Sequence, residues 1–286
     1  MPDLAYVNGQ IMPIEKAVVP IEDRGYQFGD GVYEFVASYG GHLFMLEEHL
    51  DRLERSMREL AFDPISRADI RKAILDLFGL SGYQRAAIYL QISRGVAPRN
   101  HAITPGMPPQ IIMTIRPVKE MPGEIRKNGA TAITVQDTRW GRCDIKTVQL
   151  LANSLAKQKS LDAGCDDAIF VSDQGIVREG TSSNLFVVSG GRLTTHPLTD
   201  HILPGITRMV VLAVCKEAEL EVEESFFGTE ELYGSDEVFL SGTVTELLPM
   251  VRIDGKSIGD GKVGPITRRL YDLLRKQAMT GGAGII

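Results

Sequence analysis

The chain has 286 residues, of which 43% are hydrophobic and 24% are charged, and its formal net charge is −6. These values are typical of a globular protein with one large domain or two ordinary ones, and the negative charge disfavours nucleic acid as a partner. No run approaches the roughly 18 consecutive apolar residues that a membrane helix needs. The N-terminus has no basic segment followed by an apolar one, so we expect no secretory signal.

The cysteines and histidines of the chain form no metal-binding pattern. Three cysteines occur without a CxxC pair, and five histidines occur without an HExxH arrangement. An odd number of cysteines without such spacing favours reduced thiols and a cytoplasmic location. We therefore expect no metal site.

The first half of the chain combines helical and strand-like patterns. Asn8-Gly9 between apolar flanks predicts a hairpin turn, and Ser66 followed by an acidic residue three positions later predicts a helix N-cap. The predicted elements are a hairpin at Asn8-Gly9, helices over 46–60 and from Ser66 to Gly79, and strands over 85–94 and 110–116. This half is therefore predicted to be an α+β unit.

The second half begins after the segment 117–124, which contains two prolines and a glycine and is the best linker candidate. We predict an N-terminal domain over 1–118, a linker over 119–126 and a C-terminal domain over 127–286. The predicted elements are strands over 130–136, 168–171, 176–178, 184–188, 192–195 and 237–240, and helices over 147–163, 205–220 and 265–277. Glycine-containing turns between the four strands from 168 to 195 indicate a meander.

Three features could carry chemistry. Lys146 follows Asp144 and precedes a helical pattern, and a lysine becomes a nucleophile or base where a dry site lowers its pKa. Glu179 opens a Glu-x-Thr-x-x-Asn pattern that leads into a polar turn. The segment 203–208, Leu-Pro-Gly-Ile-Thr-Arg, predicts a helix start whose unpaired N–H groups suit a phosphate.

Each feature has a common structural alternative. Lys146 could be a surface lysine, the Glu179 segment an ordinary β-turn, and the 203–208 segment an ordinary helix start. The usual phosphate motifs are absent. Asp254-Gly-Lys-Ser257 lacks the earlier glycine of a P-loop, and the early glycines do not have dinucleotide-binding spacing.

Four segments in one order change this balance. They are Arg24–Glu34, Arg142–Lys146, Glu179–Phe186 and Leu203–Arg208. This set resembles the class IV pyridoxal-phosphate aminotransferases, and most closely their D-amino-acid branch, and the resemblance extends from Asn8 to Arg268. It implies an α+β fold of type IV, with a smaller N-terminal α/β domain and a larger C-terminal cofactor-binding domain that contains a pseudo-barrel.

The resemblance also implies a role for each matching residue. Lys146 would form the Schiff base with pyridoxal 5′-phosphate, and Glu179 would hold a proton on the pyridine nitrogen. Arg52 would bind the phosphate, for which a planar guanidinium is well suited. The other cofactor ligands would be Leu203 on the ring face, the backbone of Ile206 and Thr207, the backbone of Gly242 and the hydroxyl of Thr243.

Substrate recognition is implied at Tyr33, Arg99 and His101. Arg99 and His101 are two residues apart, which places both side chains on one face of an extended segment. A solvated loop is the common alternative. In the D-amino-acid branch such residues hold the substrate carboxylate, with the Arg-x-His pair donated by a neighbouring subunit. The resemblance therefore implies at least a homodimer with active sites at the interface.

The implied reaction is a ping-pong transamination through a pyridoxamine phosphate form. A D-amino acid such as D-alanine or D-glutamate would donate to a 2-oxo acid such as 2-oxoglutarate or pyruvate. Three alternatives stay open at this point: a transaminase for branched-chain L-amino acids or (R)-amines, an aminodeoxychorismate lyase, and a non-catalytic metabolite-binding protein. The Arg99 and His101 pair favours D-amino acids.

Overall fold

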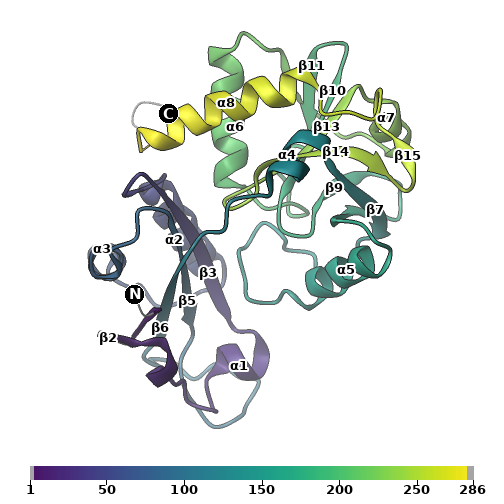
Figure 1. The fold of residues 1–286 in the computed structure, drawn as a ribbon. Helices are drawn as coiled ribbons and strands as arrows, with labels where there is room; N and C mark the ends of the chain where they lie inside the picture. Colours follow the sequence, from purple (N-terminus) through teal and green to yellow (C-terminus); the bar gives the residue numbers. More distant parts are fainter. Residues whose placement is uncertain (1–2, 282–286) are drawn as a thin grey trace. The chain divides into compact units, whose positions relative to one another are not determined.

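The structure, a computed structural model, describes residues 3–281, and the chain divides into two compact units (Figure 1). The first unit comprises Met1–Lys119 and Ile145–Gln149, and the second comprises Glu120–Asp144 and Leu150–Ile286. Each unit has its own sheet and its own hydrophobic core. The predicted two-domain α+β class is confirmed.

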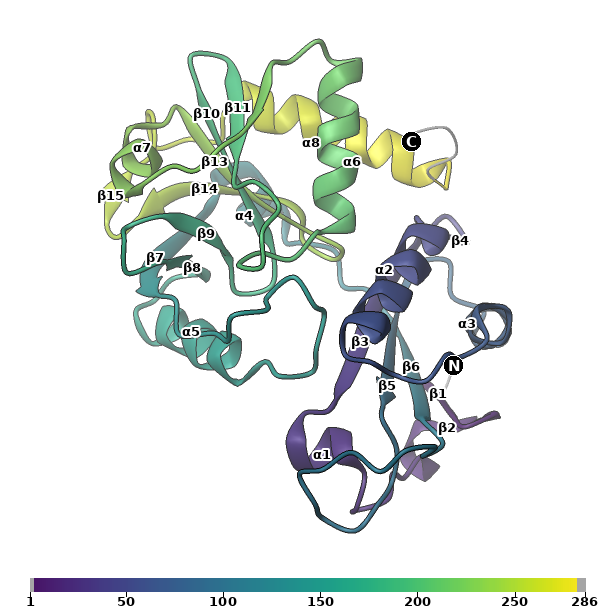
Figure 2. The ribbon, with the colours of Figure 1, turned by 180° about the vertical axis from the view of Figure 1, so that it is seen from behind.

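The first unit is built on a six-stranded sheet with the order β2-β1-β6-β5-β3-β4. Its elements are β1 (Leu4–Val7), β2 (Gln10–Pro13), the 3-10 helix η1 (Ile14–Lys16), α1 (Arg24–Phe28), β3 (Gly31–Tyr39), β4 (His42–Leu43), α2 (Leu46–Glu59), α3 (Arg67–Ser81), β5 (Ala86–Ser93) and β6 (Gln110–Pro117). Buried residues of α2, α3 and the central strands form one core cluster, which includes Leu50, Ile74 and Ile88. Figure 2 shows α2 alongside β3.

The hairpin prediction and several element predictions in this unit are confirmed. Asn8 and Gly9 have φ values of 46° and 99°, as a tight hairpin turn requires, and β1 pairs antiparallel with β2. The helix predicted over 46–60 is α2, and the two predicted strands are β5 and β6. Strand β3, which carries Tyr33, lies outside the predicted elements.

Helix α3 begins where the sequence predicts but ends later. The hydroxyl of Ser66 accepts a hydrogen bond from the N–H of Asp69, which is an N-cap contact. The predicted end at Gly79 is wrong, because the helix continues to Ser81 and is followed by Gly82 with φ of 67°. A glycine inside a helix costs only about 1 kcal/mol, whereas a left-handed residue after the last turn ends the helix.

The second unit is built around a closed ring of six strands. Strands β10, β13, β14, β7, β8 and β9 pair in that order, and β9 pairs again with β10. The elements of this unit are α4 (Gly123–Asn128), β7 (Ala130–Gln136), α5 (Leu151–Asp162), β8 (Asp167–Val171), β9 (Val177–Gly180), β10 (Asn184–Ser189), β11 (Arg192–Thr195), α6 (Ile206–Glu217), β12 (Val222–Glu224), α7 (Thr229–Gly234), β13 (Glu237–Gly242), β14 (Glu246–Ile253), β15 (Lys256–Ser257) and α8 (Pro265–Met279). The predicted pseudo-barrel is confirmed.

The connections within this barrel also agree with the sequence. Strands β8, β9, β10 and β11 pair consecutively and antiparallel, so the predicted meander is confirmed. Helices α6 and α8 lie side by side in both views and contact the barrel at β13 (Figures 1 and 2). Helix α5 packs on β7 and β8. Between residues 3 and 281, none of the helices has the length and apolarity needed to span a membrane.

The predicted start of the helix over 147–163 is wrong, because α5 begins only at Leu151. The preceding residues run along β3 instead. The C=O of Lys146 accepts from the N–H of Tyr33 (3.0 Å), and the N–H of Val148 donates to the C=O of Gly31 (3.1 Å). Backbone groups bonded to a strand cannot also form helical hydrogen bonds, and Ile145–Gln149 belongs to the first unit. The predicted division into 1–118, 119–126 and 127–286 stays a prediction.

Candidate active site

Lys146 has a fixed backbone and a partly accessible amine. Its N–H donates to Ser56 Oγ of α2 (3.3 Å), in addition to the bond between its C=O and Tyr33. Its Nζ lies 4.1 Å from the centroid of the Tyr33 ring, a cation–π distance. The neighbouring Ile145 and Thr147 are buried, and Lys146 is half-buried. The structure thus brings the predicted catalytic lysine and a predicted substrate-binding residue together.

Arg52, the predicted phosphate ligand, is part of a buried cluster with Glu34 and His49. Arg52 Nε donates to Glu34 Oε1 (2.7 Å) and Nη2 donates to Glu34 Oε2 (2.8 Å), a bidentate pairing. His49 Nδ1 lies 2.6 Å from Glu34 Oε2. Because an ionised carboxylate only accepts, Nδ1 carries the proton and donates. The exposed fractions of the three side chains are between 1% and 7%.

The electrostatics of this cluster favour an ionised pair beside a neutral imidazole. Burial alone would raise the pKa of Glu34, but Arg52 and His49 hold it well below its ordinary value. Burial lowers the pKa of His49 and outweighs the opposing effect of Glu34. Sequence reasoning missed Glu34 and His49. The available signal was a carboxylate inside the largely apolar run 32–37, since a buried charge requires a partner.

Arg99 and His101 lie on an exposed loop and contact the same aromatic ring. The Arg99 guanidinium is 4.5 Å from the centroid of the Phe28 ring, and the His101 ring centroid is 5.4 Å from it. Tyr33 instead contacts Lys146. Within one chain, the three predicted substrate-binding residues therefore fall into two groups, one at Phe28 and one at the lysine.

Glu179 at the end of β9 is a buried carboxylate that three donors surround. Its Oε2 accepts from the N–H of Leu203 (3.1 Å) and from Asn184 Nδ2 (3.0 Å), and its Oε1 accepts from Arg139 Nη1. The structure thus brings the predicted Glu179 and Leu203 together. Burial raises the pKa of Glu179, and Arg139 and the Leu203 N–H oppose that rise. Two carboxylate oxygens have about four acceptor sites, so one further N–H can be accommodated.

Arg139, which sequence reasoning missed, links Glu179 to a second carboxylate. Its Nε and Nη2 donate to Asp137 Oδ1 (3.0 Å) and Oδ2 (2.8 Å), and Arg178 donates to the same Oδ2 (2.7 Å). The guanidinium also lies 4.2 Å from the centroid of the Phe170 ring. Although burial opposes it, the two arginines lower the pKa of Asp137. Nothing in the local pair of Asp137 and Arg139 indicates a partner 40 residues later.

The start of α6 is an anion-binding type of helix terminus. Gly205 is its N-cap, and among the described residues no side chain caps the helix. The N–H groups of Ile206 and Thr207 therefore have no acceptor within the helix. A Cβ at Gly205 would lie 2.0 Å from Asn184 Oδ1, so the position requires glycine.

Hydroxyl groups without partners lie near the end of β13. Among residues 3–281, the side-chain oxygens of Ser183, Ser241 and Thr245 are buried and have no hydrogen-bond partner. A Cβ at the predicted Gly242 would lie 2.8 Å from Thr245 Oγ1 and 3.8 Å from Ser183 Cβ, and the predicted Thr243 follows it. Sequence reasoning missed these three hydroxyls. An oxyanion would satisfy such donors.

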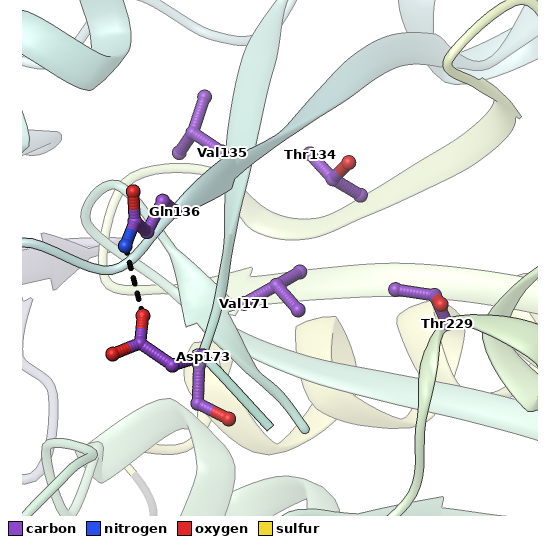
Figure 3. Close-up of a pocket in the computed structure, with 7 residues that line it drawn as sticks. Thr134, Val135, Gln136, Val171, Asp173 and Thr229 are labelled. Atoms are coloured by element: carbon purple, nitrogen blue, oxygen red, sulfur yellow. Dashed lines mark hydrogen bonds between the residues drawn. The ribbon is translucent and has the colours of Figure 1, made fainter. Parts of the chain in front are cut away.

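A separate pocket of the second unit contains none of the predicted site residues (Figure 3). Its volume is about 510 Å³, and it is lined by Thr134, Val135, Gln136, Val171, Ser172, Asp173 and Thr229. Gln136 Nε2 donates to Asp173 Oδ1 (2.8 Å), as Figure 3 shows. The single acidic group is thus already hydrogen-bonded, and we assign this pocket no role.

The site residues agree with similarities to known proteins. Residues 31–253 match the family described as amino-transferase class IV. The chain is 42% identical to a D-alanine aminotransferase of Bacillus licheniformis over 96% of both chains, and 40% identical to a D-alanine aminotransferase of Staphylococcus haemolyticus over 95% of this chain and 96% of the relative. A solved structure of a branched-chain aminotransferase from the thermophilic archaeon Thermoproteus uzoniensis with norvaline is similar with a TM-score of 0.89, at 26% identity over 99% of this chain and 96% of that one.

Proposed function

The chain belongs to the class IV aminotransferases, and from that premise we propose that it transfers amino groups between D-amino acids and 2-oxo acids. The donor would be a compound such as D-alanine or D-glutamate, and the acceptor one such as 2-oxoglutarate or pyruvate. The observation that carries the choice of D-amino acids is the 42% identity to a D-alanine aminotransferase along nearly the whole chain. The pair Arg99 and His101 at one ring supports it.

The described residues fit pyridoxal 5′-phosphate, on which this family depends. Glu179 has acceptor capacity for one further N–H, as a protonated ring nitrogen would supply. The uncapped helix start at Ile206 and Thr207 suits a phosphate, as do the unpartnered hydroxyls beside Gly242 and Thr243. When bound, the cofactor supplies an electron sink for the substrate and carries the amino group between the two half-reactions.

The protein's own groups would perform three tasks around that cofactor. Arg52 would bind phosphate oxygens, held in place by its bidentate contact with Glu34. Leu203, whose N–H and C=O are both hydrogen-bonded, would pack on the ring face. Lys146 Nζ would hold the cofactor between turnovers and, once displaced by the substrate amine, would accept and return the proton of the substrate Cα.

Substrate orientation would depend on Tyr33, Arg99 and His101. A guanidinium and an imidazole can both donate to a substrate carboxylate, and fixing the carboxylate decides which face of Cα is presented to the base. Arg99 and His101 would act at the site of a neighbouring subunit, because their contacts in one chain are with Phe28 and not with the lysine.

A homodimer is therefore part of the proposal. Val18, Ile21 and Tyr26 are large apolar side chains with exposed fractions between 75% and 79%, and such a group of exposed residues is typical of an interaction surface. We also propose a cytoplasmic location, which the three free cysteine thiols support.

The proposal predicts the outcome of a half-reaction test. The purified, cofactor-loaded protein is mixed separately with D-alanine, L-leucine, (R)-1-phenylethylamine or no donor, and the cofactor's absorption spectrum is recorded. D-alanine should convert the cofactor to its amine form much faster than either other donor. Faster conversion by L-leucine or by the amine would favour the branched-chain or amine transaminase, and would overturn the assignment of Arg99 and His101.

The lyase and the non-catalytic alternative give different outcomes. An aminodeoxychorismate lyase would release pyruvate from its substrate without an amino acceptor and would leave the spectrum with D-alanine unchanged. A metabolite-binding protein would show no turnover with any donor. Transfer of the amino group of D-alanine to 2-oxoglutarate would exclude both.

Arg99→Ala should weaken D-alanine binding more than any step of the chemistry. Hydrogen bonds to charged groups are worth about 1.5–3 kcal/mol, so the KM for D-alanine should rise roughly 10- to 100-fold. The rate of the slow half-reaction with (R)-1-phenylethylamine, which has no carboxylate, should change little. Arg71→Ala, which removes an exposed arginine paired with Glu47, is the matched control and should alter neither value. Equal effects of Arg99→Ala on both donors would remove the carboxylate-binding role.

A further inference from the structure

Arg24, at the start of α1, is a buried arginine that holds the loop bearing Arg99 and His101. Its exposed fraction is only 5%. Its Nη1 donates to the C=O of Asn100 (2.6 Å) and to the C=O of Ala102 (3.5 Å), and its Nη2 donates to the C=O of His101 (3.3 Å). One guanidinium therefore contacts three consecutive carbonyl groups of this loop.

The other side of the same guanidinium is fixed from within the first unit. Arg24 Nε donates to Asp30 Oδ2 (2.8 Å), and Asp30 also accepts from Arg94 Nε (3.0 Å). Arg94 is itself anchored to the C=O groups of Leu60 (2.8 Å) and Ala61 (3.0 Å). Because Asp30 pairs with both arginines, the position of Arg24 is coupled to the end of α2 and not only to its own short helix.

Phe28 completes the arrangement as a common stacking surface. The guanidinium of Arg24 lies 4.7 Å from the centroid of its ring, that of Arg99 lies 4.5 Å away, and the His101 ring centroid lies 5.4 Å away. The side chains of Arg99 and His101 are exposed, so their orientation depends on this ring and on the backbone that Arg24 holds.

We propose that Arg24, acting with Phe28, is a positioning residue for recognition of the substrate carboxylate. It would hold the backbone of residues 100–102 and the ring beneath Arg99 and His101, so that both donors are oriented before substrate binds. The inference rests on the proposed carboxylate-binding role of Arg99 and His101. A flexible loop would have to be ordered at each binding event, and this ordering cost would weaken substrate binding.

The test compares Arg24→Met with wild type in the steady-state transamination of D-alanine. A misplacement of about 1 Å can cost about 100-fold, so the KM for D-alanine should rise between about 10- and 100-fold, with a smaller change in kcat. Arg24→Lys, which can reach one carbonyl but lacks the planar fork, should recover part of the loss. Phe28→Leu keeps the hydrogen bonds of Arg24 and should also raise KM, which provides a second variant if Arg24→Met does not fold.

Arg85→Met is the matched control. Arg85 also stacks on an aromatic ring, that of Tyr39 at 3.9 Å, and donates to a main-chain carbonyl, that of Ser38 at 2.9 Å. Its replacement should leave the KM for D-alanine unchanged. Hydrogen exchange of the peptide 97–103 should rise in Arg24→Met and not in Arg85→Met. A normal KM in Arg24→Met and Phe28→Leu, or equal effects of Arg24→Met and Arg85→Met, would overturn the inference.

A double-mutant cycle separates this inference from the proposed function. In a background of Arg99→Ala with His101→Ala, the KM should already be high, and adding Arg24→Met should raise it less than twofold, because the groups it positions are gone. If the background variant itself has a normal KM, the proposed role of Arg99 and His101 fails. If the background has a high KM and Arg24→Met multiplies it by the same factor as in wild type, only the positioning role fails.

Discussion

Replacing Lys146 with alanine should reduce transamination by at least about 10⁴-fold, because the variant lacks both the covalent attachment of the cofactor and the base at Cα. The protein should still bind the cofactor through the other groups, since Glu179 and the start of α6 do not involve Lys146. The measurements are the steady-state rate with D-alanine and the absorption spectrum of the bound cofactor, which should be that of the free aldehyde.

Two controls define this result. Lys72→Ala removes an exposed lysine of α3 that pairs with Asp76, and it should leave rate and spectrum unchanged. Thermal unfolding of the Lys146→Ala protein should resemble that of wild type without cofactor, because the Lys146 side chain is half-buried and its described contact is with one ring. A rate within tenfold of wild type would remove Lys146 from its assigned role.

Glu34→Ala should have the largest effect on stability. The carboxylate compensates the buried guanidinium of Arg52 and accepts from His49, and removing one partner of a buried ion pair costs about 3–5 kcal/mol. The free energy of unfolding in urea is the measurement. Glu47→Ala, which removes an exposed carboxylate of α2 paired with Arg67 and Arg71, should cost less than about 1 kcal/mol.

The same cluster predicts how stability depends on pH. The pKa of Glu34 is lowered in the folded protein, so below its ordinary value of about 4.3 the unfolded chain takes up a proton that the folded protein does not, and stability falls. The lowered pKa of His49 acts in the same direction below about pH 6.5. The difference in stability between wild type and Glu34→Ala should therefore narrow below about pH 5. A difference that stays constant from pH 7 to pH 3 would contradict the ionised pairing.

Most elements of the fold could be predicted because their signals are local. The hairpin at Asn8-Gly9 and the N-cap at Ser66 depend on residues within a few positions of each other, and both are observed. The predicted helix start at 147 failed for the opposite reason. The backbone of residues 145–149 is bonded to β3, far earlier in the chain, and no local pattern reports that pairing.

The candidate site divides in the same way. Lys146, Glu179 and the 203–208 segment were identified because each has a reactive or ligand-binding group in a recognisable short motif. Glu34, His49 and Arg139 were missed, although they surround the identified residues. Their importance comes from what they contact, and a carboxylate or arginine gives no indication of a distant partner.

The order of residues was sufficient to establish the family, the cofactor and the lysine, because the chemistry of each motif depends on residue type and short spacing. Folding decided which buried charges are paired and which carbonyls are held. The pairs are Glu34 with Arg52 and His49, Arg139 with Asp137 and Glu179, and Arg24 with Asp30 and the loop 100–102. The energy of such a contact depends on distance and burial, and both are properties of the folded chain.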